Sequence, residues 1–214
     1  MRTVLRVFGE CCLTAGAIVL LFLAYLVWGT ALATSAHQHA FASQLQRQWQ
    51  AHHDAKPATT RLHLVTGQSF AFIRIPRFGR QWRFAVVQGT GLAQLALGPG
   101  HVPGTALPGR IGNFAVAAHR VTAGNPFYHL NQLRPGDKVM ITTAATTYTY
   151  QVTRTELVLL GDTAVLDPVP GHPRQRPRQA MITLITCDPP WTGTHRIIVF
   201  GSLDAQTPRT GHNG

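Results

Sequence analysis

Cysteine and acidic side chains are scarce in this sequence. Only three of the 214 residues are cysteine and only eight are Asp or Glu, against 19 Lys or Arg, which gives a formal net charge of +11. Cys11 and Cys12 lie in an apolar N-terminal segment, so Cys187 stands alone in the rest of the chain. A disulfide within that part of a single chain is therefore excluded. With no carboxylate cluster and no Cys/His group at ligand spacing on a rigid element, we expect neither a metal ion nor another cofactor.

Charge is also absent from a long N-terminal stretch, because residues 11–46 contain no Lys, Arg, Asp or Glu. Residues 11–34 are mostly apolar and, at about 1.5 Å per residue, can cross a hydrocarbon core of about 30 Å. They predict a transmembrane signal-anchor after a short segment, residues 1–10, with a cleaved signal peptide as the alternative. Arg2 and Arg6 precede the anchor. The positive-inside rule therefore predicts a single-pass protein of the cell membrane, with its N-terminus in the cytoplasm and its main domain outside.

The positive charge is carried almost entirely by arginine, four of which recur at Arg74, Arg77, Arg80 and Arg83. Nucleic-acid-binding proteins show a basic helical stripe or aromatic residues interleaved with basic ones, and this sequence has neither. We therefore predict no nucleic-acid partner. An exported basic domain is better suited to anionic lipid or wall polymer.

The remaining sequence divides into three parts by composition. Residues 35–60 are polar and predict a stalk, helical over part of its length, while residues 204–214 predict a disordered tail. Residues 61–203 contain short β-branched runs separated by Gly and Pro, which is typical of an all-β barrel or sandwich. The predicted strands cover residues 70–75, 84–88, 113–118, 138–143, 147–159, 181–186 and 196–203. Helical turns are expected at 91–97 and 126–133, and a long loop at 161–180.

Cys187 ends one of these apolar runs, and Arg196 opens the next. The segment between them contains two prolines and a glycine, so it cannot continue as helix. If the two runs are neighbouring strands, a thiol and a guanidinium project from the same edge of a sheet. A cysteine beside a fixed cation is a candidate nucleophile, although many lone cysteines are small core residues.

A thiol also needs a base, and His119 ends a third apolar run, 113–118. His101 is the rival histidine, but it lies in a segment dense in Gly and Pro. Arg120 follows His119 and alternates to the opposite face of the strand, which predicts a structural role.

These motifs together resemble the sortase family of membrane-anchored cysteine transpeptidases. The family signature Thr-Leu-x-Thr-Cys matches Thr183, Leu184, Thr186 and Cys187, and its arginine matches Arg196. Its histidine strand matches residues 113–120, and its Gly-rich stretch matches 98–109. The resemblance covers about residues 74–203 and is strongest to the actinobacterial class E housekeeping group. It implies a closed eight-stranded β-barrel over 61–203.

The resemblance further implies a reaction. Cys187 would attack an LPXTG- or LAXTG-like sorting signal after its threonine, with His119 as general acid and base and Arg196 as substrate or oxyanion partner. Four further residues would bind substrate: Thr186, His101, Val102 and Thr105. The implied partners are secreted proteins with C-terminal sorting signals and an amine of a peptidoglycan precursor of the lipid II type. A pilin-polymerising sortase and an inactive barrel acting as an extracellular binding module are the alternatives.

Overall fold

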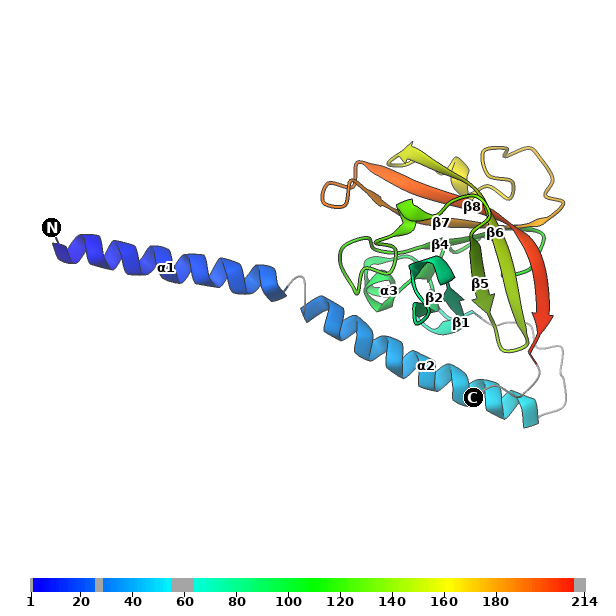
Figure 1. Cartoon of the computed structure of the whole chain (residues 1–214), viewed down its shortest axis with the longest axis horizontal. Helices are drawn as coiled ribbons and strands as arrows, with labels where there is room; N and C mark the ends of the chain where they lie inside the picture. The colour runs from blue at the N-terminus through cyan, green and yellow to red at the C-terminus, as the bar shows by residue number, and fades with distance from the viewer. Residues whose placement is uncertain (1, 26–28, 55–63, 210–214) are drawn as a thin grey trace.

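Two N-terminal helices and a closed β-barrel make up the chain (Figure 1). The computed structural model describes residues 2–25, 29–54 and 64–209. Helix α1 covers Arg2–Ala24 and projects away from the barrel, whereas α2, Thr30–Asp54, runs along the side of the barrel. The length and apolar composition of α1 suffice to cross a membrane. The predicted boundary between a non-spanning segment, 1–10, and an anchor, 11–34, differs from this helix, which begins at Arg2 and ends at Ala24.

The barrel closes in the order β1-β2-β3-β4-β7-β8-β6-β5, with β5 returning to β1. The pairs β2–β3 and β4–β7 are parallel, and the other neighbouring strands of the barrel are antiparallel. The strands are β1 (Ser69–Arg74), β2 (Arg83–Gln88), β3 (Gly100–His101), β4 (Gly112–Ala117), β5 (Lys138–Thr142), β6 (Thr146–Leu159), β7 (Ala180–Asp188) and β8 (His195–Pro208). The short helices are α3 (Leu92–Leu97), η2 (Pro76–Phe78), η3 (Leu130–Gln132) and η4 (Ala164–Leu166). The predicted closed eight-stranded all-β barrel is confirmed.

The barrel interior is filled by side chains from every second position of its strands, as the pleat of a β-strand requires. Phe114 and Val116 of β4 pack with Ile182 and Leu184 of β7 in one continuous core. Each such side chain contributes about 1.5–3 kcal/mol when fully buried. This packing fixes the parallel β4–β7 pair that carries the candidate histidine and cysteine.

The barrel differs from the prediction in two places. The eighth strand, β3, is absent from the predicted strands, because it is only two residues long and lies within the Gly-rich stretch that was predicted to form turns. Strand β8 continues to Pro208, whose register partner on β6 is Thr146, so residues 204–208 are strand and not a disordered tail. The side chains of this extension are mostly polar, so no apolar pattern in the sequence predicts the strand. Its pairing with β6 depends on backbone hydrogen bonds.

The predicted polar stalk is also wrong for residues 35–54, because they belong to α2 and dock on the barrel. Leu45 and Trp49 are buried against Phe72 of β1 and Ala85 of β2. The amide of Gln38 donates to the carbonyl oxygens of Leu97 (2.7 Å) and Ala85 (3.3 Å), and accepts from the backbone N–H of Ala85 (2.6 Å). A polar amide thus completes the hydrogen bonding of barrel backbone. Residues 55–60 of the predicted stalk lie outside the described residues.

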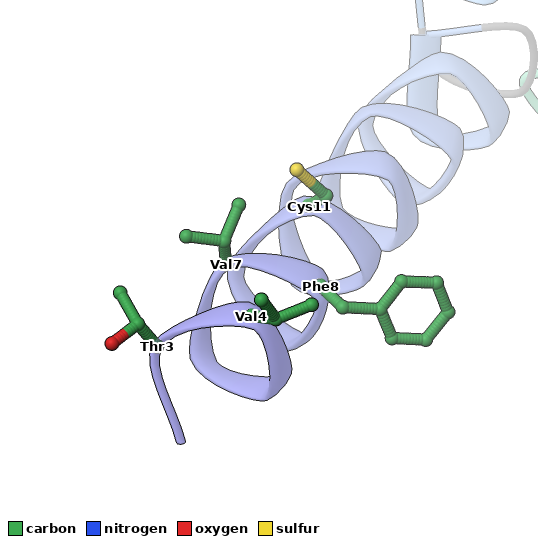
Figure 2. A pocket seen from close by; sticks show the side chains of 5 residues that line it. All are labelled: Thr3, Val4, Val7, Phe8 and Cys11. Carbon is green, nitrogen blue, oxygen red and sulfur yellow. The ribbon is translucent and has the colours of Figure 1, made fainter. Parts of the chain in front are cut away.

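Helix α1 carries a shallow hollow of about 400 Å³, lined by Thr3, Val4, Val7, Phe8 and Cys11 (Figure 2). All its walls come from one helix, and its side chains are almost wholly apolar. Such a surface suits contact with acyl chains better than a polar reaction. The chemistry of this chain must therefore be sought on the barrel.

Candidate active site

Strands β7 and β8 bring Cys187 and Arg196 together. The two residues are direct register partners in this antiparallel pair, at the end of β7 and near the start of β8. Side chains of directly opposed residues lie on the same face, about 4.5–5.5 Å apart at Cβ. Cys187 is half-buried. The prediction that these two residues meet at one sheet edge is confirmed.

The Arg196 guanidinium is held in place by backbone oxygens. Its Nη1 donates to the carbonyl oxygens of Gly193 (2.7 Å) and His195 (2.8 Å). Gly193 has a φ of +60° and borders both functional groups. A Cβ built there would lie 3.5 Å from Arg196 Nη1 and 3.8 Å from Cys187 Sγ. These are ordinary van der Waals distances, so it is the left-handed backbone at this turn that favours glycine beside the thiol and guanidinium.

His119 reaches the same end of the barrel from β4. Strand β4 runs parallel to β7, with Ala117 opposite Ile185. The Ala118 N–H donates to the Ile185 carbonyl (3.1 Å), and the Thr186 hydroxyl donates to the Ala118 carbonyl (2.9 Å). Strand β4 ends at Ala117, and the bonds of Ala118 bring His119, the next residue, to the end of the barrel that carries Cys187. Thr186 is buried and thus fixes the backbone that carries His119, instead of offering its hydroxyl to a ligand.

Arg120 clamps the cysteine strand from the other face. Its Nη1 donates to the carbonyl oxygen of Cys187 (3.2 Å) and pairs with the Asp188 carboxylate. The Arg120 side chain is buried, and its Nε has no hydrogen-bond partner among the described residues. A partly buried ion pair of this kind fixes local geometry, because separating its members leaves the buried Arg120 charge uncompensated. These contacts with Cys187 and Asp188 support the predicted structural role of Arg120.

His101 lies in the barrel wall with 2% of its surface exposed. Its Nδ1 lies 2.7 Å from Gln88 Oε1, and its Nε2 lies 3.0 Å from the Thr105 hydroxyl and 3.2 Å from the Ala106 carbonyl. The ring also stacks on Phe114, with centroids 5.1 Å apart. Both nitrogens are therefore occupied within the protein, and His101 braces the Gly-rich segment.

Val102 and Thr105 lie on this same segment, away from Cys187. The Val102 N–H donates to the Ala115 carbonyl (2.9 Å), and the Ala115 N–H donates to the Thr105 hydroxyl (3.3 Å). Ala115 pairs with Thr183, four residues before Cys187, or about 13 Å along the strand. The structure therefore does not bring His101, Val102 and Thr105 to the thiol, and their predicted contact with a more distant part of an extended substrate stays a prediction.

Asn113 anchors the long loop before β7. Its side-chain amide donates to the carbonyl oxygens of Val165 (3.0 Å) and Asp167 (3.2 Å), and its oxygen accepts from the Thr183 hydroxyl (2.7 Å). Val165 is buried against Ile198. The predicted long loop, 161–180, is thereby tied to both β4 and β7 near its beginning. This amide has no local signal in the sequence, because its partners lie 52 to 70 residues away.

Burial shapes the protonation of both histidines. Desolvation lowers the pKa of His119 below its ordinary value of 6.5. The pKa of His101 is lowered mainly by burial as well, partly offset by its hydrogen bonds to Ala106 and Thr105. Neutral imidazole is therefore the dominant form of both rings at neutral pH. A neutral His119 is able to accept a proton and, once protonated, to release it readily.

The arrangement combines a half-buried thiol, an imidazole just after the end of the adjacent strand and a fixed guanidinium. This set can form and resolve a thioester, since it holds a nucleophile, an acid–base group and a cation for a developing oxyanion. Across residues 2–25, 29–54 and 64–209, no three His, Cys, Asp or Glu side chains gather closely enough to hold a metal ion.

Comparison with known proteins gives a consistent result. A family model for the sortase domain matches residues 73–204. Over 96% of its length the chain is 32% identical to sortase SrtE1 of Streptomyces coelicolor, and it spans 58% of that relative. Among solved structures, sortase E of Streptomyces avermitilis is 41% identical with a TM-score of 0.61, over 67% of this chain and 93% of that one. Sortase E1 of S. coelicolor, solved with a tripeptide in its active site, is 32% identical with a TM-score of 0.62, over 69% and 94%.

Proposed function

Since the chain belongs to the sortase family, we propose that it is a membrane-anchored cysteine transpeptidase that joins secreted proteins to the cell wall. One observation carries the proposal most directly. The Cys187 thiol faces the Arg196 guanidinium across one antiparallel pair, while parallel pairing with β4 directs His119 to the same end. An inactive binding module would have no need to keep all three groups at one edge.

The first half-reaction is acylation of Cys187. Its sulfur attacks the carbonyl carbon of the threonine in an LPXTG- or LAXTG-like sorting signal, and the bond from that carbon to the next residue's nitrogen breaks. His119, neutral at first, takes the proton of the Cys187 thiol and then gives it to the departing amine. The products are a thioester on Cys187, a neutral His119 and the released C-terminal segment. Burial favours this transfer, because it weakens the hold of His119 on the proton.

The second half-reaction transfers the protein to an amine of a peptidoglycan precursor of the lipid II type. The amine nitrogen attacks the thioester carbon while His119 accepts a proton from it. The carbon–sulfur bond then breaks and His119 returns its proton to the sulfur, which regenerates the Cys187 thiol and leaves the protein in amide linkage to the acceptor. Arg196 stabilises the oxyanion of each tetrahedral intermediate, and its bonds to Gly193 and His195 preorganise it for this task.

Membrane attachment completes the proposal. Helix α1 is apolar, exposed along its length and long enough to span a bilayer. Arg2 and Arg6 at its start favour a cytoplasmic N-terminus and an extracellular barrel. Substrates of this reaction then arrive from the outer face of the membrane.

Intact-mass spectrometry tests the proposed reaction on the full chain in detergent micelles. The chain carries Cys11→Ser and Cys12→Ser, so that Cys187 is its single thiol, and is mixed with LPXTG- and LAXTG-type peptides. We expect an acyl adduct on Cys187 and, on adding a peptidoglycan stem peptide with a free amine, a ligated product. Cys187→Ala should abolish the adduct, and His119→Ala should abolish turnover.

Two results would redirect the assignment. Ligation to a lysine-containing pilin-type peptide, with none to the stem peptide, would establish the polymerising alternative. A folded chain that forms no adduct with either peptide class would contradict the transpeptidase and support a binding module.

A further inference from the structure

The strand directions place several connections at the end of the barrel that carries Cys187. Strands β4 and β7 end there, and β8 begins there, because Cys187 pairs with Arg196. Strand β6 ends there too, since Leu159 pairs with His195. We call this the active-site end. Figure 1 shows the connection from β7 to β8 on the side of the barrel from which α1 projects.

Large apolar side chains are exposed at this end. Trp191, in the β7–β8 connection, is 80% exposed, and Leu159 and Leu160, at the end of β6, are 68% and 61% exposed. The two segments adjoin, because the Leu160 N–H donates to the Thr194 carbonyl (3.1 Å). We name Trp191, Leu159 and Leu160 the apolar rim. Exposed side chains of this kind on adjacent segments mark a surface that contacts a partner or a membrane.

Helix α2 indicates which partner covers the rim. Its first turns contact the active-site end, where the Thr34 hydroxyl donates to the Ala96 carbonyl (2.9 Å) and its methyl faces Gly124, in the connection that follows His119. Its last turns reach the opposite end, where Arg209 stacks on Trp49 at 4.3 Å. Because α2 follows α1 in the chain and begins at the active-site end, this end of the barrel is the one nearer to α1.

The tether between the helices is short. Five residues, 25–29, separate Ala24 from Thr30. Such a length spans no more than about 20 Å even when fully extended. If α1 crosses the bilayer, the active-site end must lie close to the outer membrane surface, and the apolar rim is at that end.

Charge at this end favours the same partner. Strand β1 ends and β2 begins at the active-site end, and Arg74 and Arg80 are exposed along this connection. Basic side chains attract anionic headgroups, while Trp and Leu enter the boundary between headgroups and acyl chains.

We propose that the apolar rim inserts into the outer leaflet of the membrane that α1 spans and seats the active-site end on the lipid surface. The occupant is an anionic bilayer surface, and the contact rests on the membrane attachment proposed above, not on the transpeptidase reaction. Seating in this way would hold Cys187 within reach of substrates that are themselves membrane-bound.

Lipid quenching of tryptophan fluorescence tests this contact in the full chain. The chain is reconstituted into phosphatidylglycerol vesicles whose acyl chains are brominated near the headgroup. The difference between the native chain and Trp191→Phe isolates the emission of Trp191. We expect brominated lipid to reduce that emission roughly twofold and iodide in solution to have little effect, because an interfacial tryptophan lies at the headgroup level.

Two matched variants place a tryptophan at either end of the barrel in the Trp191→Phe background. Leu160→Trp adds it to the rim, and Ile111→Trp adds it before β4 at the opposite end, where the native side chain is 64% exposed. We expect lipid quenching for Leu160→Trp and iodide quenching for Ile111→Trp. Vesicle flotation after alkaline carbonate, and circular dichroism, check insertion and folding of each variant.

The outcomes separate the proposals. Chains that float while Trp191 responds to iodide alone would retain the anchor and overturn the lipid contact. Protection of Trp191 from both quenchers would overturn it in favour of a protein partner, such as a second copy of the chain. Chains released from the vesicles by carbonate would overturn the anchor and the contact together, leaving the thioester chemistry to its own test.

Discussion

Replacing Gln38 by alanine tests whether α2 is an integral part of the folded barrel. The side chain makes three hydrogen bonds to barrel backbone, two to Ala85 and one to Leu97. Ala85 is almost fully buried, so its N–H is shielded from water that could replace the lost partner. Gln46, on the exposed face of the same helix, offers a matched control for the change in helix propensity.

The expected loss of stability follows from those contacts. A hydrogen bond contributes about 0.5–1.5 kcal/mol, and a buried group left without a partner costs about 1–3 kcal/mol. Gln38→Ala should therefore lower the free energy of unfolding by about 2–4 kcal/mol. In a chain of this size that corresponds to a fall in Tm of about 4–16 °C. Gln46→Ala should change stability by no more than about 0.5 kcal/mol.

Thermal unfolding of the full chain in detergent, followed by circular dichroism, measures the difference. Hydrogen exchange of the α2 amides supplies a second readout, which should accelerate in Gln38→Ala and stay slow in Gln46→Ala. Equal melting of the two variants, together with rapid α2 exchange in the native chain, would refute the docking and restore a solvated stalk.

Three further predictions concern the site. Arg120→Met should slow acyl-enzyme formation roughly 10–100-fold, because it releases the strand end that carries Cys187. Arg120→Lys should recover part of the rate. An unchanged rate in Arg120→Met would contradict the proposed role of Arg120 in holding this strand end. Because burial lowers the pKa of His119 and His101, the unfolded chain binds more protons, so stability should decline as pH falls below 6.5 toward the lowered values. NMR titration should give midpoints below 6.5 for both rings, and a higher midpoint would count against their burial. Asn113→Ala should destabilise the chain by about 2–4 kcal/mol and speed exchange around residues 164–167; uniform exchange across the loop would argue against the anchor.

The placement of the three candidate site residues could be predicted because their signal is local. Cys187 and Arg196 each border a short apolar run, and the turn residues between them allow only a tight return of the chain. The pattern predicted that both reach one sheet edge, and the register confirms it. His119 was predicted from its position at the end of such a run, and the parallel pair β4–β7 brings it to the same end.

The supporting residues were harder to predict because their partners are distant. Thr186 looked like a substrate contact, yet its hydroxyl serves the backbone before His119. His101 looked like a site histidine, yet both its nitrogens are used inside the barrel wall. In each case, the role depends on a backbone or side-chain group that only folding brings near.

The sequence by itself determined the apolar N-terminal helix, most strands of the barrel and the three candidate site residues. These features depend on composition and on the period of apolar residues, which act over short stretches of chain. Only the tertiary structure decided that residues 35–54 dock on the barrel, that β8 extends to Pro208 and that Arg120 holds Asp188. Those features depend on backbone hydrogen bonds and on partners far apart in sequence. A polar side chain such as Gln38 looks the same in a sequence whether it faces water or a buried carbonyl.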